Sequence, residues 1–263
     1  MRALGSRYNN HLVDEENPYW ISFSDIMAGL LVIFMLAVVA LILELTQKSQ
    51  EWDEVIEEIV KAEQVRNDLL YDIVKELNDK NIPVYLSENA TVLRVPEDAL
   101  SFESGKYRFE KESQTETAIV IAKVIYQAII KGDRQKYLDT IFIEGHTDDS
   151  PYNREAIKGN WGLSTFRAIE LWETWEEFID QENRLVELEN SMGKKLFSVS
   201  GYADTRPAKC TNSDGAINNP VICPDGPLSD SLSKKKNRRI DIRFTVKHPT
   251  LRELEDMKKS KDL

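Results

Sequence analysis

One acidic side chain, Asp25, lies inside an apolar run that is long enough to cross a membrane. Residues 21–43 contain no other Asp, Glu, Lys or Arg. About 20 apolar residues suffice for a transmembrane helix. A carboxylate at the bilayer centre costs on the order of 2.5–3.5 kcal/mol, so acids in membrane helices usually have a function such as ion transfer. A second interpretation stays open, because Asp25 is near the start of the run and could reach the membrane surface or cap the helix.

The residues around Asp25 favour the first interpretation. Positions three, four and seven apart share one face of a helix. The face that includes Asp25 is small and polar, a composition that lets membrane helices approach closely. It consists of Ser22, Asp25, Ala28, Gly29 and Val32. The sequence therefore predicts a protonatable carboxylate on a face that packs against other membrane helices.

A second candidate site combines an acid and an arginine in the C-terminal half. A predicted strand ends at Asp148, and a predicted helix that begins after Asn160 carries Arg167. The loop carboxylate, the helix start and the guanidinium can then converge. A zwitterionic amino-acid ligand needs an acid for its ammonium and an arginine fork for its carboxylate. The ordinary alternatives are an Asx turn at Asp148 and a solvated helix-face charge at Arg167.

Composition restricts the classes of protein to consider. The 263 residues include 34 Lys and Arg against 45 Asp and Glu, a formal net charge of −11. So acidic a chain is a poor candidate for nucleic-acid binding. The apolar run is too long and starts too late for a cleavable signal peptide. Cys210 and Cys223 share one loop-like stretch, where a disulfide is expected in an extracytoplasmic domain and reduced thiols are the alternative. A two-Cys metal site is not expected, because nearby His ligands are missing.

The pattern along the chain predicts a membrane helix followed by an α/β or α+β domain. The expected segments are a tail over 1–18, a transmembrane helix over 19–45, a helical linker over 46–80, the domain over 81–247 and a charged tail over 248–263. Within the domain we expect a hairpin over 82–96, helices over 112–130 and 162–190, and strands over 137–149, 196–204 and 238–246. The linker carries a broken apolar seam, which could pack on its own domain or form a short dimeric coil.

Several spaced motifs resemble the OmpA-like peptidoglycan-binding domain over about residues 82–247. They are FESG at 102–105, GHTDDSP at 145–151, NWGLSTFRA at 160–168, GY at 201–202 and NRRID at 237–241. The resemblance implies that the ligand is the diaminopimelate of the cell-wall peptide. It assigns Asp148 and Arg167 to the ligand, and it places Thr147, Asn160, Leu163, Arg238 and Arg239 around the pocket. His146 has a structural role in that family, and no second His stands at ligand spacing for a metal. The cysteine-bearing insertion stretches the family's spacing between GY and NRRID, which affects the rim of the pocket.

An early membrane Asp, a helical linker and an OmpA-like domain together resemble the MotB class of ion-driven stator subunits. Residues 24–31 (SDIMAGLL) are more similar to the ZorB family of the Zorya anti-phage systems than to the flagellar pattern. This resemblance implies a homodimer in the bacterial inner membrane, inside a ring of ZorA-like subunits. It also implies a cytoplasmic N-terminus, a periplasmic domain, Asp25 as the proton carrier and no cofactor.

Two rival functions can be compared with the stator interpretation. A passive wall anchor would have no ion flow, and Asp25 would tolerate Asn. A wall hydrolase is the weakest interpretation, because an ionised Asp paired with Arg is tuned away from proton transfer. We therefore expect no enzymatic activity.

Overall fold

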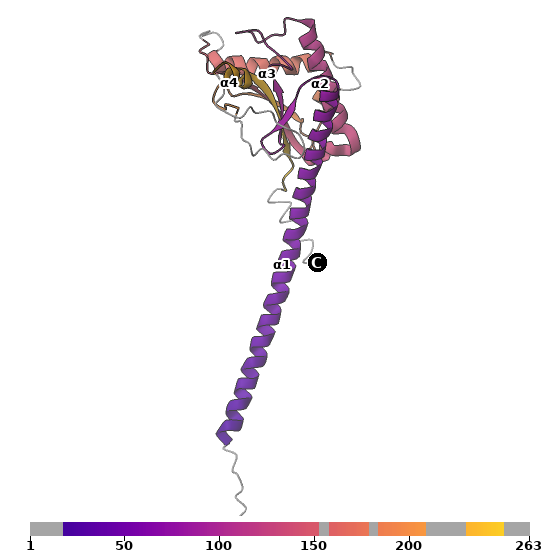
Figure 1. The fold of residues 1–263 in the computed structure, drawn as a ribbon. Coiled ribbons are helices and arrows are strands. Elements are labelled where there is room, and N and C mark those ends of the chain that lie inside the picture. The colour runs from indigo at the N-terminus through magenta and orange to yellow at the C-terminus, as the bar shows by residue number, and fades with distance from the viewer. Residues whose placement is uncertain (1–17, 153–157, 179–183, 209–229, 250–263) are drawn as a thin grey trace, which may run out of the picture.

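The longest element is α1, an α-helix over Pro18–Asp79. The structure is a computed structural model that describes residues 18–152, 158–178, 184–208 and 230–249. Residues 30–79 contain no Gly or Pro, so nothing in the sequence interrupts the helix there. At 1.5 Å per residue the helix is about 90 Å long. It projects from the domain as one rod (Figure 1).

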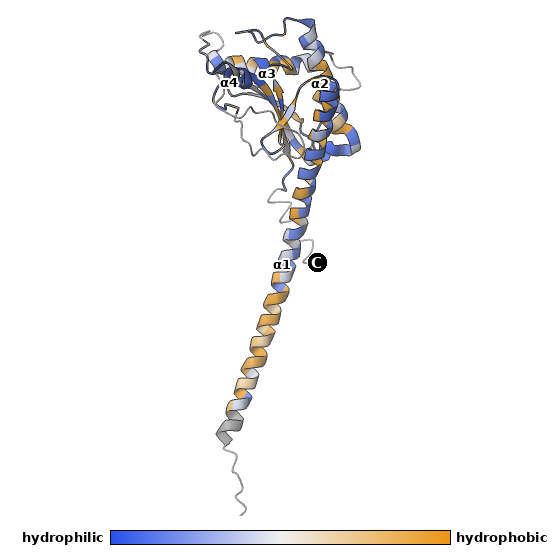
Figure 2. Cartoon of the chain, viewed as in Figure 1, coloured by the Kyte–Doolittle hydropathy of each residue, from blue (hydrophilic) through white to orange (hydrophobic). Residues whose placement is uncertain are grey.

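The N-terminal part of this rod is apolar on all sides. Figure 2 shows an apolar band there, followed by a polar stretch toward the domain. The helix is long and apolar enough to cross a membrane, and none of its most apolar window is buried inside the molecule. Phe34, for example, is 70% exposed. A continuous apolar surface of this size is unusual on a soluble protein, and a bilayer would cover it.

The C-terminal part of α1 belongs to the core of the domain. Its buried residues include Leu70, Ile73 and Leu77, each 0% exposed. Burial begins at Ala62, which is 2% exposed, whereas Trp52 is 62% exposed. The packed domain thus begins within the predicted linker over 46–80, before the predicted start of the domain at residue 81. The second half of the linker's apolar seam packs on its own domain, which is one of the two alternatives given above.

The sheet has five strands in the order β1-β2-β5-β3-β4. They are β1 (Tyr85–Ser87), β2 (Val92–Pro96), β3 (Leu138–His146), β4 (Phe197–Gly201) and β5 (Arg239–Val246). β3 and β4 are parallel, and the other neighbouring pairs are antiparallel. The predicted hairpin over 82–96 is confirmed, with left-handed backbone at Glu88, Asn89 and Ala90 in its turn.

Helices cover one face of the sheet. They are the end of α1, α2 (Glu112–Ile130) and α3 (Gly159–Phe178), and α3 connects the two parallel strands β3 and β4. Along β5, Ile240, Ile242 and Phe244 point into this core because side chains alternate between the faces of a strand. A fourth helix, α4 (Asp230–Asn237), precedes β5, and short 3₁₀ helices occupy Lys131–Tyr137 and Leu185–Glu187. The predicted fold class, an N-terminal apolar helix followed by an α/β domain, is confirmed.

The predicted helix over 162–190 was too long. Among the described residues, α3 ends at Phe178, and Leu185 lies in the 3₁₀ helix Leu185–Glu187. Asn190 then forms a turn, in which its side-chain oxygen accepts hydrogen bonds from the backbone N–H groups of Met192 and Lys194. Such side-chain bonds to the local backbone compete with helix formation.

Candidate functional site

Two glycines let the first turns of α3 lie directly on the sheet. A Cβ atom added at Gly145 would be 1.9 Å from the carbonyl oxygen of Ser164, and one at Gly201 would be 2.2 Å from Oγ1 of Thr165. No side chain fits at either position without moving the helix. Because Gly145 is near the end of β3, this close contact brings the loop after β3 to the start of α3.

The loop after β3 is fixed by hydrogen bonds on both sides. Oδ1 of Asp148 accepts a hydrogen bond from the backbone N–H of Ser150 at 3.0 Å, which is the Asx turn expected as the ordinary alternative. Nδ2 of Asn160 donates to the carbonyl oxygens of Ser150 at 3.1 Å and Asp148 at 3.4 Å. The start of α3 therefore positions the backbone that carries Asp148.

The other carboxylate oxygen of Asp148 is bound to Arg238. Nη1 of Arg238 donates to Oδ2 of Asp148 at 2.6 Å. Nε and Nη2 of the same guanidinium each donate to Glu97 at 2.8 Å. Burial alone would raise the pKa of Asp148, but the hydrogen bonds from Arg238 and Ser150 outweigh it and lower the pKa below its usual value. Asp148 is therefore ionised at neutral pH and shares one cation with Glu97.

Arg167 is a buried cation. It is 5% exposed. Its Nε donates to the carbonyl oxygen of Lys106 at 3.0 Å, and its Nη2 to that of Glu103 at 3.4 Å. Within the described part of the chain, no carboxylate oxygen lies within ion-pair distance of its guanidinium. Burial lowers the pKa of Arg167 to about 10, although the charge of Glu97 opposes the shift. A buried cation without a counterion is costly, so this site is suited to receive an anion.

Glu97, Arg167 and Arg238 line one shallow hollow at the end of the sheet, and Asp148 is joined to it through its bond to Arg238. The free space in the hollow is about 10 Å³, room for about one water molecule. It is lined by Glu97, Leu100, Phe102, His146, Arg167, Arg238 and Arg239. Acids and guanidiniums beside an apolar wall suit a ligand that carries both an ammonium and a carboxylate.

The other predicted site residues are distributed as follows. Leu163 is 5% exposed, in the first turns of α3. The N–H of Thr147 donates to the carbonyl oxygen of Ala203 at 2.9 Å, which holds the loop against the segment after β4. Nε of Arg239 donates to Asp241 at 3.0 Å, and its Nη2 donates to the carbonyl oxygen of Arg206 at 3.0 Å. Arg239 thus has a carboxylate partner, which it shares with Arg94, whereas Arg167 has none among the described residues.

The remaining predicted residues are not part of this hollow. Asp25, Ala28 and Gly29 lie on the apolar part of α1, where their side chains are exposed. The side chain of Ser22 is outside the described residues. Cys210 and Cys223 also lie outside them, so the expected disulfide stays a prediction.

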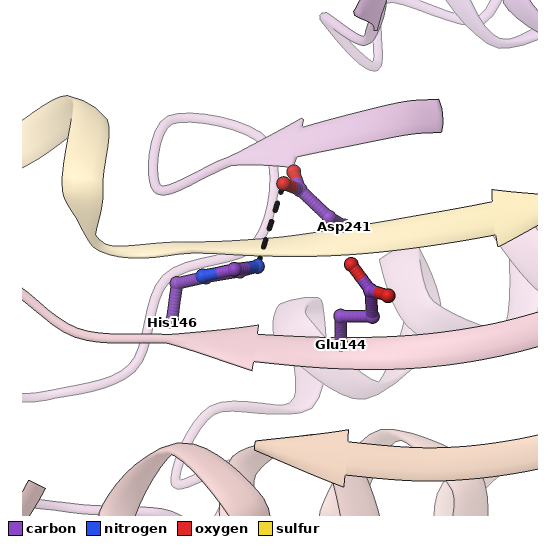
Figure 3. A group of neighbouring side chains, drawn as sticks. All are labelled: Glu144, His146 and Asp241. Atoms are coloured by element: carbon purple, nitrogen blue, oxygen red, sulfur yellow. Dashed lines mark ion pairs between the residues drawn. The ribbon is translucent and has the colours of Figure 1, made fainter. Parts of the chain in front are cut away.

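Next to the hollow, Glu144, His146 and Asp241 form a buried group whose ligand atoms lie within 4.8 Å of one another (Figure 3). Such a group could hold a metal, but its carboxylates are already occupied. Nε of Arg94 donates to Asp241 at 2.8 Å, and Nε of Arg243 donates to Glu144 at 2.8 Å. A divalent cation would have to displace these guanidiniums.

His146 itself is neutral in this group. Burial lowers its pKa to about 3, and the charge of Arg239 adds to the shift. Its Nε2 lies 3.4 Å from Oδ2 of Asp241, but this contact lacks hydrogen-bond geometry, and neither ring nitrogen has a hydrogen-bond partner among the described residues. The ring stacks against Tyr202 with a centroid distance of 5.5 Å. These contacts support a packing role for His146.

Glu97 is the site residue that sequence reasoning missed. It directly follows β2, and Pro96 at the end of that strand pairs with Arg239 at the start of β5. This register places Glu97 beside Arg238. The signal exists only once the pairing of β2 with β5 is known, because the two residues are 141 positions apart.

One protein with a similar sequence is a motility protein. Motility protein B of Bacillus subtilis (strain 168) is 26% identical over 173 residues, which is 65% of this chain and 52% of the relative. The chain thus spans about half of the length of that relative. No protein-family model matches the chain.

Several solved structures are also similar to the chain. A putative MotB like protein from Desulfovibrio vulgaris is 18% identical with a TM-score of 0.45, over 73% of this chain and 98% of that one. The periplasmic domain of Helicobacter pylori MotB is 20% identical with a TM-score of 0.40, over 65% of this chain and 85% of that one. The cell wall anchor of the T6SS from Pseudomonas aeruginosa is 17% identical with a TM-score of 0.41, over 68% of this chain and 97% of that one.

Proposed function

We propose that this chain is the wall-anchored subunit of a proton-driven membrane motor. The single observation that carries the proposal is Arg167, a buried guanidinium without a carboxylate partner among the described residues. It lines the same hollow as Arg238, which holds Asp148 at 2.6 Å. An unneutralised cation beside an ionised acid is the arrangement that a zwitterionic ligand would complete.

The ligand that we propose is the diaminopimelate side chain of the peptidoglycan peptide. Its free end carries one ammonium and one carboxylate on the same carbon. The carboxylate would bind Arg167 through the guanidinium fork, and the ammonium would bind Asp148. The resemblance of residues 82–247 to OmpA-like domains supports this ligand. The peptide is part of a rigid wall, so binding it would immobilise the domain.

Asp25 is the proposed proton carrier. It lies on the apolar part of α1, on the same face as Ala28 and Gly29. One span alone encloses no path for ions, so we propose that two copies lie side by side within a ring of partner subunits. Protonation would remove the cost of the charge in the membrane, so proton uptake and release could drive steps of the ring past the dimer. The continuous helix α1 would then transmit the reaction force to the wall-bound domain.

The finer proposal is a motor of the ZorA–ZorB type in anti-phage defence. Residues 24–31 (SDIMAGLL) support it through their resemblance to the ZorB family. A flagellar stator subunit is the alternative, and the similarity to Motility protein B supports that one. Under either proposal the N-terminus is cytoplasmic and the domain periplasmic, in the inner membrane.

The experiment that tests the proposal compares two phenotypes in the native host. Deletion of the gene should remove phage resistance if the motor serves defence, or swimming if it serves a flagellum. Cysteines placed singly along residues 30–45 should crosslink two copies along one helical face in membranes that also contain the partner subunit. Loss of neither phenotype, or a single copy per complex by native mass spectrometry, would reject the motor.

A further inference from the structure

We propose that Glu97 determines the ligand specificity of the hollow by supplying the second negative charge that an ammonium-bearing ligand requires. The inference rests on the proposed binding of diaminopimelate at Asp148 and Arg167. Glu97 lines the hollow together with Arg167 and Arg238. Its side chain is 20% exposed, so it is screened by solvent less than a surface acid would be.

Glu97 changes the net charge around Asp148. The guanidinium of Arg238 donates two hydrogen bonds to Glu97 and one to Asp148. One cation is thus shared by two carboxylates, and the three groups together carry one net negative charge. Without Glu97, Arg238 would neutralise Asp148 completely. The charge of Arg167 would then make the hollow more positive, which favours a plain carboxylate over a zwitterion.

Glu97 also affects how a ligand reaches Asp148. An incoming ammonium must replace the hydrogen bond that Arg238 makes to Asp148. Arg238 can release this bond without losing its counterion, because Glu97 holds it through two bonds of 2.8 Å. If Glu97 were neutral, the release would leave Arg238 without an anionic partner. Glu97 therefore acts through Arg238 and positions it.

Glu97 also sets the charge of the complete site. Arg239 lines the hollow as well, and it shares the buried carboxylate of Asp241 with Arg94, so these three groups together carry one positive charge. Beside them, the two acids Glu97 and Asp148 balance the two guanidiniums Arg167 and Arg238. Without Glu97 the positive charge around the hollow would rise from one to two, which disfavours the ammonium of a ligand end that carries one ammonium and one carboxylate.

The test measures selectivity rather than binding alone. The full-length protein in detergent micelles is titrated with the tripeptide L-Ala–D-Glu–meso-diaminopimelate and with the same peptide acetylated at the free amine of diaminopimelate. Wild-type protein should prefer the free-amine peptide. The selectivity ratio is the dissociation constant of the acetylated peptide divided by that of the free-amine peptide. In E97Q this ratio should fall by about tenfold, because the hollow no longer favours an ammonium.

The matched control is D98N, which removes the same charge one residue further along. Asp98 is 61% exposed and pairs at the surface with Lys235. The ratio in D98N should stay within about twofold of the wild-type ratio, because exposed charges are screened. An E97Q ratio equal to that of D98N and wild type would overturn the inference. If the wild-type protein binds neither peptide, the proposed function itself fails, and the two failures are thereby distinguished.

A second pair of variants tests the charge count with the opposite sign. R238Q removes the shared cation and keeps Glu97, so the preference for the free-amine peptide should rise. The double variant E97Q/R238Q restores one acid against one guanidinium, and its ratio should return toward the wild-type value. A ratio that falls in R238Q, or a double variant as unselective as E97Q, would contradict the inference. Thermal melting of each variant checks that the domain is folded.

Discussion

The guanidinium carbon of Arg167 lies 5.1 Å from the centre of the Phe102 ring. This contact, with hydrogen bonds to two backbone carbonyl oxygens, holds a buried cation that has no carboxylate partner among the described residues. Cation–π contacts and neutral acceptors compensate for burial less fully than an ion pair would. Arg167 is thus expected to reduce the stability of the domain in return for ligand binding.

We therefore predict that Arg167→Met raises the free energy of unfolding by about 1 kcal/mol while it abolishes peptide binding, because an apolar side chain removes the unpaired charge. Urea denaturation and calorimetric titration measure the two effects. The matched control is Arg94→Met, which removes two charged hydrogen bonds to the buried Asp241 and should cost about 2–3 kcal/mol, while Arg239 still pairs with that carboxylate. Equal destabilisation in both variants would show that Arg167 is a structural residue.

In the membrane segment, Asp25→Asn should abolish motor function while expression, membrane insertion and assembly stay normal, because Asn has no proton to release. Asp25→Glu should retain more function than Asp25→Asn, although the longer side chain is harder to fit on the small face. Asp53→Asn is the matched control, since Asp53 lies on the same helix beyond the apolar run. Full phage protection or swimming with Asp25→Asn would reject ion coupling and favour a passive anchor.

The contact between β3 and α3 predicts the effect of adding one methyl group. Gly145→Ala should destabilise the domain by about 3 kcal/mol, because the new Cβ would overlap the backbone of Ser164, which cannot turn away as a side chain could. Ser198→Ala on β4 should change the stability by less than about 1 kcal/mol. Denaturation curves of both variants measure this, and a Gly145→Ala protein as stable as Ser198→Ala would contradict the close approach of α3 to β3.

The buried imidazole predicts a pH dependence of stability. The folded-state pKa of His146 is about 3, against an ordinary value of 6.5. The unfolded chain therefore binds a proton that the folded chain excludes, and stability falls as the pH drops from 6.5 toward 3. Between pH 7 and pH 4 the loss that is due to His146 should be about 2–4 kcal/mol.

His146→Gln should remove most of this loss, whatever it does to the stability at pH 7. His248→Gln is the control, because it makes the same substitution at an exposed histidine outside the buried group. Urea denaturation at the two pH values gives the difference for each protein. A His146→Gln protein as sensitive to acid as the wild type would mean that His146 titrates normally.

Much of the fold follows from local patterns in the sequence. The helix Glu112–Ile130 was predicted with its observed bounds, because apolar residues recur at helical spacing between a polar start and a glycine-bearing end. The strands were predicted from β-branched and aromatic runs next to turn residues. The glycines of GHTDD and GY were identified as parts of motifs, but their physical reason, the contact with Ser164 and Thr165, appears only in the structure.

What the sequence did not determine are relationships between distant elements. The apolar seam of α1 continues through Leu70 and Leu77, and a periodic pattern alone does not say whether the domain or a second copy buries it. In the same way, Asp148 was expected to serve the ligand directly. Its bond to Arg238 depends on the antiparallel pairing of β3 with β5, which places the end of β3 beside the start of β5. The pattern in 162–190 also continued past the true end of α3, because side-chain turns at Asn190 are not visible in apolar periodicity.

Co-sedimentation of the full-length protein with purified sacculi tests the central claim most directly. We predict that wild-type protein sediments with diaminopimelate-containing sacculi and is released by excess diaminopimelate tripeptide. The Asp148→Ala/Arg167→Ala variant should stay in solution, because each change leaves a charged ligand group unpaired at a cost of about 2–5 kcal/mol. Sacculi that carry lysine in place of diaminopimelate lack the carboxylate for Arg167 and should bind weakly. Sedimentation of the double variant at the wild-type level would contradict the account.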